Sequence, residues 1–102
     1  MTDPLTKINS ETASIWYLYI VENRLGHWYT GITTDPERRF AEHQASGKKT
    51  AKALRGKGPL VMRYCQPMES RRQASQMEYQ LKQLTKAEKR RFVNGQLSLP
   101  GE

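Results

Sequence analysis

The sequence predicts a single α+β domain, and its local patterns give the order of the elements. An unbroken aromatic and aliphatic run at 16–21 has the composition of a strand covered on both faces. Turn-forming residues at 22–26 separate this run from 27–33, so the two segments are predicted to form a hairpin. A third apolar strand is expected at 60–65.

Capping residues and apolar spacing predict three helices. The first starts at 34–37, where a threonine or aspartate cap, a proline and a glutamate follow one another, and it ends near Ser46. The second covers 69–84, and the third follows the cap Thr85 over 86–93. A basic segment between the first helix and the third strand is either a short helix or a mobile loop.

We expect the folded domain to cover 14–94. Residues 1–13 are polar and lack periodicity, so they are predicted to form a flexible N-terminal arm, and 95–102 a flexible C-terminal tail. A chain of 102 residues has room for one small core, which buries roughly 60% of the surface of the unfolded chain.

Charge is distributed unevenly along the chain. The net charge is +7, and fifteen of the 17 Lys and Arg residues lie in 38–102, against five of the 10 acidic residues. A basic block of this kind is typical of proteins that bind polyanions, although a merely solvated surface explains the charge equally well.

Cysteine and histidine usage excludes two kinds of stabilisation. Cys65 is the only cysteine, so no internal disulfide can form, and we expect a reducing compartment and no disulfide-linked partner. Two histidines and one cysteine do not form a zinc-binding pattern.

Because no apolar run is long enough for a membrane span or a signal peptide, the sequence predicts a soluble cytoplasmic protein.

Five side chains that can take part in catalysis lie at defined spacings along the sequence. Strand alternation places Tyr29 on the same face as Gly31, and helical spacing places two further polar residues, four apart, on one face. The set comprises Tyr19, Tyr29, Arg39, His43 and, in the later helix, Glu78.

Glu78 lies within about 70° of the centre of the apolar stripe of its helix. A carboxylate at the margin of a core-facing stripe has to be paired, bound to a metal, or exposed at a cleft. The ordinary alternative is an ion pair with Lys82 one turn later, which contributes about 0.3–0.5 kcal/mol.

These residue types match the needs of phosphodiester hydrolysis. Mg²⁺ often takes one or two protein carboxylates, so Glu78 can suffice as its ligand. Arg39 offers a planar fork of donors to phosphate oxygens, and His43 can bind phosphate or move a proton near neutral pH. A tyrosine, Tyr19 or Tyr29, can act as a base where nearby positive charge stabilises its anion.

The pattern resembles the GIY-YIG nuclease superfamily over about 16–92, in particular its short stand-alone bacterial members. The two motifs read Tyr17-Leu18-Tyr19 and Tyr29-Thr30-Gly31 here, in place of Gly-Ile-Tyr and Tyr-Ile-Gly. The resemblance implies a small central antiparallel sheet of three strands flanked by helices.

The resemblance also implies a metal-dependent endonuclease that acts on DNA, with a role in DNA repair or processing. Glu78 would hold a single Mg²⁺ or Mn²⁺, Arg39 would bind phosphate, and Tyr29 or Tyr19 would assist the attacking water. His43 stands where the family places a histidine or a tyrosine.

The basic segment is predicted to contact the phosphates of DNA, including flaps, nicks or branches, through Lys48, Lys49, Lys52, Arg55 and Lys57. The main alternative is a non-catalytic basic module that binds DNA or RNA. Glu78 favours the enzyme, because an acid beside bound phosphate opposes binding unless a cation lies between them.

Overall fold

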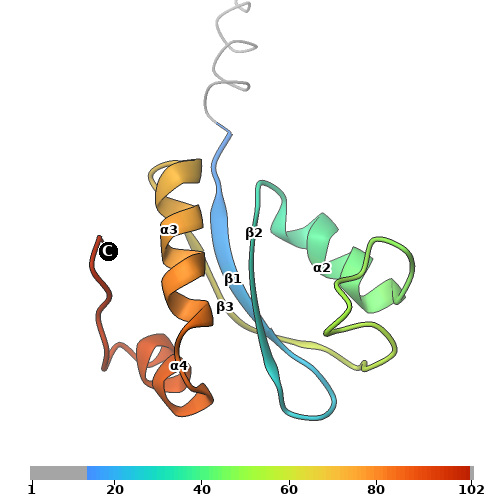
Figure 1. The fold of residues 1–102 in the computed structure, drawn as a ribbon. Coiled ribbons are helices and arrows are strands. Elements are labelled where there is room, and N and C mark those ends of the chain that lie inside the picture. The colour runs from blue at the N-terminus through green and yellow to red at the C-terminus, as the bar shows by residue number, and fades with distance from the viewer. Residues whose placement is uncertain (1–13, 102) are drawn as a thin grey trace, which may run out of the picture.

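The computed structural model describes residues 14–101, so the predicted N-terminal arm at 1–13 lies outside the described residues. The elements follow the order expected from the sequence (Figure 1). They are β1 (Tyr17–Glu22), β2 (Trp28–Thr33), α2 (Pro36–Ala45), β3 (Val61–Pro67), α3 (Arg71–Lys82) and α4 (Lys86–Val93). The predicted α+β class is confirmed.

The three strands form one antiparallel sheet in the order β2-β1-β3. The helix α2 and the segment that follows it cover one face, and α3 and α4 cover the other (Figure 1). Because β1 is central, its residues are buried on both faces, which explains why its sequence is an unbroken apolar run rather than an alternating one.

Each face of the sheet has its own core. Leu18 and Ile20 point toward α3 and α4, where Met77 and Phe92 complete a buried cluster. Tyr19 and its neighbours on the opposite face pack with residues of the segment after α2. Each fully buried aliphatic side chain contributes about 1.5–3 kcal/mol, so the two clusters fix both layers of helices on the sheet.

Local capping sets the helix boundaries. Asp35 caps α2 by accepting a hydrogen bond from the backbone N–H of Arg38 at 3.1 Å. The helix ends at Ser46, whose φ of 55° is left-handed. Thr85 and Glu88 form the predicted capping box at the start of α4.

The two segments that the sequence left least defined are both in contact with the domain. Residues 46–60 form a series of turns rather than a helix, anchored by the buried Leu54. At the other end, the side chain of Gln80 donates to the carbonyl of Pro100 at 2.9 Å, and Leu99 packs against the core. The flexibility expected of 95–102 and the domain limits stay predictions.

No helix within 14–101 has the length and apolar character that a membrane crossing needs.

Candidate active site

Tyr19 and Gly31 face each other across the β1–β2 pair. The Tyr19 ring lies directly over the glycine, because a Cβ at position 31 would lie 2.5 Å from the phenol oxygen and 2.6 Å from Cζ. Such distances are far inside van der Waals contact, so any larger residue at 31 would displace the tyrosine. Gly31 is thus needed for its missing side chain, as a close approach within the sheet requires.

His43 fixes the outer end of Tyr19. Its ring is fully buried on α2, and its Nε2 lies 2.9 Å from the Tyr19 Oη. The backbone N–H of Ala51 donates to the other ring nitrogen, Nδ1, at 3.4 Å. Since Nδ1 accepts a hydrogen bond, the proton of the neutral ring is on Nε2, and this N–H donates to the tyrosine oxygen.

Burial keeps both partners of this hydrogen bond uncharged. Burial, together with the positive charge of Arg39, lowers the pKa of His43 to about 4, while Glu42 opposes the change. Burial, followed by the proximity of Tyr29, raises the pKa of Tyr19 well above its ordinary value, although Arg39 acts in the opposite direction. Near neutral pH the imidazole is therefore neutral and Tyr19 keeps its proton.

Tyr29 completes a cluster of three rings. Its ring centroid lies 6.3 Å from that of Tyr19 and 5.6 Å from that of His43, the latter in an edge-to-face arrangement. Tyr29 is half-buried, whereas Tyr19 is 2% exposed. Of the two tyrosines, Tyr29 is therefore the one whose hydroxyl is better placed to meet a substrate.

Arg39 is held in place by two acceptors on different elements. Its Nη1 donates to Glu42 at 3.0 Å and to the backbone carbonyl of Lys49 at 2.6 Å. The hydrogen bond from Arg39 holds the pKa of Glu42 below its ordinary value, so the pair is fully ionised at neutral pH. Lys49 and Arg38 lie on the same carboxylate, at 4.0 Å and 3.5 Å.

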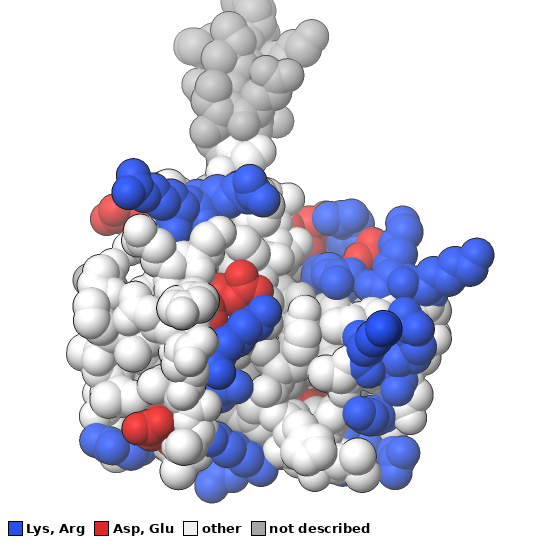
Figure 2. Space-filling view, in the orientation of Figure 1, with Lys and Arg blue, Asp and Glu red and all other residues white. Residues whose placement is uncertain are grey.

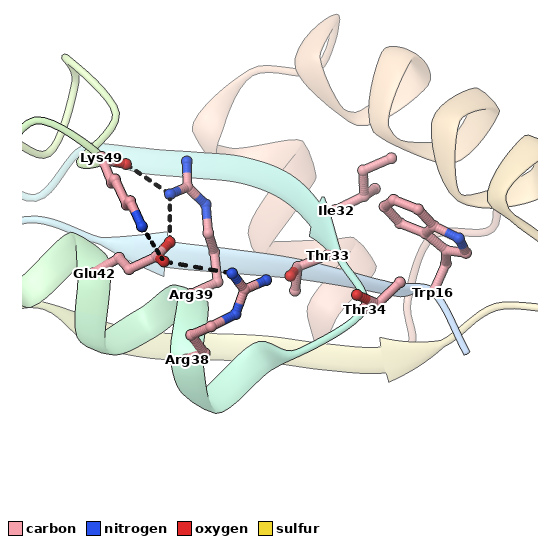
Figure 3. A pocket seen from close by; sticks show the side chains of 8 residues that line it. All are labelled: Trp16, Ile32, Thr33, Thr34, Arg38, Arg39, Glu42 and Lys49. Carbon is pink, nitrogen blue, oxygen red and sulfur yellow. Dashed lines mark hydrogen bonds and ion pairs between the residues drawn. The ribbon is translucent and has the colours of Figure 1, made fainter. Parts of the chain in front are cut away.

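A cavity of about 450 Å³ opens beside Arg39, at the end of β2 (Figure 3). Trp16 and Ile32 form an apolar wall at one end, and the basic side chains of α2 and the following turn lie at the other end. Thr33 and Thr34 lie between the two walls. The cavity combines positive charge, hydroxyl groups and apolar surface, which suits a segment of a nucleic-acid chain.

Glu78 reaches this region from α3, on the other face of the sheet. Its carboxylate forms the ion pair with Lys82 at 3.1 Å, the ordinary arrangement considered from the sequence. It is also close enough to Tyr19 for its negative charge to contribute to the raised pKa of that tyrosine. With 23% of its side chain exposed, Glu78 is both paired and partly open to solvent, although it does not line the cavity beside Arg39. Among residues 14–101, no three His, Cys, Asp or Glu side chains gather as a metal-binding group.

The basic segment after α2 is less uniform than its sequence predicts. Arg55 donates to the carbonyls of Lys48 and Thr50 at 3.4 Å and 3.1 Å, so it also braces its own turn. Lys57 is half-buried, whereas Lys48 and Lys52 are exposed. Basic side chains gather on this side of the molecule (Figure 2).

The sequence reasoning missed the residues that position the site. Thr50 is buried and donates to the carbonyl of Glu42 at 2.6 Å, which ties the turn at 47–50 to the end of α2. Glu42 orients Arg39, and Lys89 lies beside Lys82 at the start of β2. The i,i+4 relation of Lys82 to Glu78 and the i,i+3 relation of Glu42 to Arg39 are signals present in the sequence, whereas Thr50 and Lys89 left none.

A small α+β domain that combines tyrosines, a histidine, an arginine and a glutamate near basic side chains has the composition expected of a nuclease domain. Family comparison matches residues 15–91 to the GIY-YIG catalytic domain. The chain therefore belongs to the GIY-YIG nuclease family.

Sequence relatives support the same assignment. The UPF0213 protein of Cronobacter sakazakii is 51% identical over 86 residues, which cover 81% of this chain and 85% of that protein. The UPF0213 protein YhbQ of Escherichia coli is 50% identical over 78 residues, which cover 76% of each chain.

Two solution NMR structures share the fold. The UPF0213 protein BH0048 of Bacillus halodurans is 38% identical, with a TM-score of 0.51 over 78% of this chain and 83% of that one. The protein EF2693 of E. faecalis is 30% identical, with a TM-score of 0.58 over 79% and 84%. The three-stranded antiparallel sheet flanked by helices, expected from the resemblance, is thus confirmed.

Replacement of Gly31 by alanine tests the close approach of Tyr19. We expect Gly31→Ala to lower the free energy of unfolding by about 1–3 kcal/mol, because the buried ring cannot move away from the added methyl group. Gly47→Ala is the matched control, since nothing lies within 4 Å of a Cβ at that position. Urea denaturation of the two variants measures the difference, and equal stabilities would show that the ring does not lie over Gly31.

Proposed function

We propose that this protein is a divalent-metal-dependent endonuclease that hydrolyses phosphodiester bonds of DNA in the cleft between α2 and α3. The observation that carries the proposal is the convergence of Arg39 from α2, Tyr29 from β2 and Glu78 from α3 on one region. A role in DNA repair or processing is part of this proposal and follows from the family alone.

Arg39 would bind the scissile phosphate. Glu42 and the Lys49 carbonyl occupy one nitrogen of its guanidinium, which fixes the plane of the group. The remaining N–H groups can donate to non-bridging phosphate oxygens and stabilise the charge that develops on them during attack. A prepositioned arginine loses little side-chain freedom when the substrate binds.

The donor set fits a divalent ion that is bound through a single carboxylate. The oxygens of Glu78 are hard ligands, and their pairing with the ammonium of Lys82 at 3.1 Å supports a position where positive charge is favoured. Water and a phosphate oxygen would complete the coordination, as is common for Mg²⁺ and acceptable to Mn²⁺. When bound, such an ion supplies charge neutralisation at the phosphate and a more acidic water.

The two tyrosines would have different roles in proton transfer. The Tyr19 oxygen accepts the Nε2–H of His43, so its own O–H would remain available to orient the attacking water or the phosphate without giving up its proton. Tyr29 would take the proton of that water. Only the phenolate form can do this, so Tyr29 would first release its own proton to solvent. Nearby positive charge stabilises the phenolate, and Lys82 lies 6.0 Å from the Tyr29 ring centroid.

DNA would enter along the basic wall formed by α2 and the turns after it. The exposed lysines of this wall, Lys48, Lys49 and Lys52, offer phosphate contacts that carry no base preference. Selectivity would then depend on DNA structure, such as a flap, nick or branch. RNA remains an alternative ligand of the same wall.

The second candidate function is a non-catalytic nucleic-acid-binding module. The observation that favours it is the closed Glu78–Lys82 pair, because a neutralised carboxylate neither binds an ion nor repels phosphate. Incubation with supercoiled and branched DNA, in magnesium, in manganese and in chelator, separates the two functions. Metal-dependent cleavage supports the enzyme, and binding without cleavage in any of these conditions supports the module.

Substitution of Glu78 tests the metal ligand. We expect Glu78→Ala to abolish cleavage while the protein stays folded and binds DNA in chelator at least as tightly as wild type, since the carboxylate holds the ion and its loss removes a negative charge from beside the DNA. Glu69→Ala removes an exposed carboxylate just before α3 and should leave cleavage unchanged. Wild-type cleavage by folded Glu78→Ala would contradict the assignment.

Phenylalanine substitutions test the two tyrosines, because they remove the hydroxyl and keep the ring. We expect Tyr29→Phe to reduce the single-turnover rate at saturating metal by roughly 10² or more, the usual scale for a lost general base. Tyr19→Phe should cost less, because the buried hydroxyl only orients a proton. Two variants as active as wild type would exclude both residues and favour the binding module.

A further inference from the structure

Lys82 lies between the proposed metal ligand and the proposed base. Its Nζ is 3.1 Å from Glu78 Oε2 and 6.0 Å from the centroid of the Tyr29 ring. About half of the Lys82 side chain is exposed, so the ammonium lies at the surface, where a ligand can reach it, rather than inside the core. An ion pair one turn apart could form anywhere on α3, but this one lies beside the residues proposed to bind the metal and to act as the base.

Lys89 adds a second positive charge next to the first. It extends from α4 to the outer edge of the sheet, where its Nζ donates to the carbonyl of Trp28 at 3.3 Å. The two ammonium groups lie along the same edge of the sheet, because Lys89 contacts Trp28 and Lys82 lies over the ring of Tyr29, the next residue of β2. Burial, and after it the charge of Lys82, lowers the pKa of Lys89, in agreement with this placement. Lys82 pairs with the carboxylate of Glu78, whereas Lys89 contacts the backbone carbonyl of Trp28, which carries no net charge. The charge of Lys89 is therefore not neutralised by either partner.

The two lysines and Arg39 lie on opposite sides of the cleft. Arg39 belongs to α2 on one face of the sheet, and the lysines belong to α3 and α4 on the other face (Figure 1). Figure 2 shows basic side chains on both sides of the hollow between them. The phosphates of DNA are closely spaced, so a DNA strand with one phosphate bound to Arg39 places neighbouring phosphates near α3 and α4.

We propose that Lys82 and Lys89 form a second phosphate-binding site, which takes a DNA phosphate next to the scissile one, and that binding there withdraws Lys82 from Glu78. Two compact ammonium groups held close together repel each other, and a phosphate diester that contacts both relieves this repulsion. The inference rests on the proposed function, since it assigns a substrate contact of the same cleft.

A coupling between DNA and the metal ion follows from this arrangement. In the free protein Lys82 occupies the cation position at Glu78 and competes with a divalent ion. When a phosphate takes the ammonium, the carboxylate becomes available, so DNA tightens metal binding. Because linkage is reciprocal, the ion also tightens DNA binding. The site would then assemble fully only on its substrate.

DNA binding measured in chelator tests the phosphate site without any cleavage. We expect Lys82→Ala and Lys89→Ala each to weaken binding and to reduce the slope of log affinity against log salt by about 1 unit, the effect of one lost phosphate contact. Arg91→Ala is the matched control. It removes the same charge from α4 at an exposed position about 200° around the helix from Lys89, and it should leave the slope unchanged.

Manganese binding tests the competition at Glu78. In protein without DNA, titration with MnCl₂ followed by electron paramagnetic resonance should show Lys82→Ala binding the ion about fivefold more tightly than wild type, at the lower end of usual couplings between sites. Lys89→Ala and Arg91→Ala lose the same charge but do not free the carboxylate, so their manganese affinity should match wild type. Glu78→Ala should bind none at this site.

The outcomes separate this inference from the proposed function. If wild type binds and cuts DNA but both lysine variants behave as Arg91→Ala, the second phosphate site is wrong and the nuclease assignment stands. An unchanged manganese affinity of folded Lys82→Ala would overturn the competition. If wild type neither binds nor cuts DNA, the proposed function itself fails. Thermal unfolding of each variant confirms that it is folded.

Discussion

The hydrogen bond between Tyr19 and His43 is the constraint on which the rest of the site depends. It joins β1 to α2 through the buried interior, and it exists because Gly31 leaves space on β2 for the tyrosine ring. The N–H of Ala51 adds the turns after α2 to the same network. Sheet, helix and basic turns are thus held together by hydrogen bonds between buried polar groups, which offset the cost of burying those groups.

The rest of the cleft is arranged around this network. With His43 fixed at the inner side of α2, helical geometry places Arg39 one turn earlier, where the Lys49 carbonyl holds it. The opposite wall is independent of the network, because α3 packs on the other face through its own apolar stripe. Glu78, at the margin of that stripe, is therefore carried to the edge of β2 by packing and not by a direct bond to the tyrosines.

The predictable features were those encoded by local pattern. The hairpin, the capping box at Thr85 and the spacing of Arg39 and His43 follow from turn chemistry and helical periodicity, and the structure has them. The brace on Arg39 and the tautomer of His43 depend on backbone atoms of the turns after α2, whose path leaves no periodic signal. Lys89 was missed for a similar reason, since its place beside Lys82 is set by the docking of α4.

The tautomer and charge of His43 are the most direct test, because the role of Tyr19 and the link between β1 and α2 derive from them. Long-range ¹H–¹⁵N NMR correlations of the imidazole, followed between pH 3 and 8, measure both, with His27→Ala used to assign the signals. The account predicts a neutral ring protonated at Nε2 that gains its second proton only near its pKa of about 4. A ring protonated at Nδ1, or one that titrates at the ordinary value of about 6.5, would contradict it.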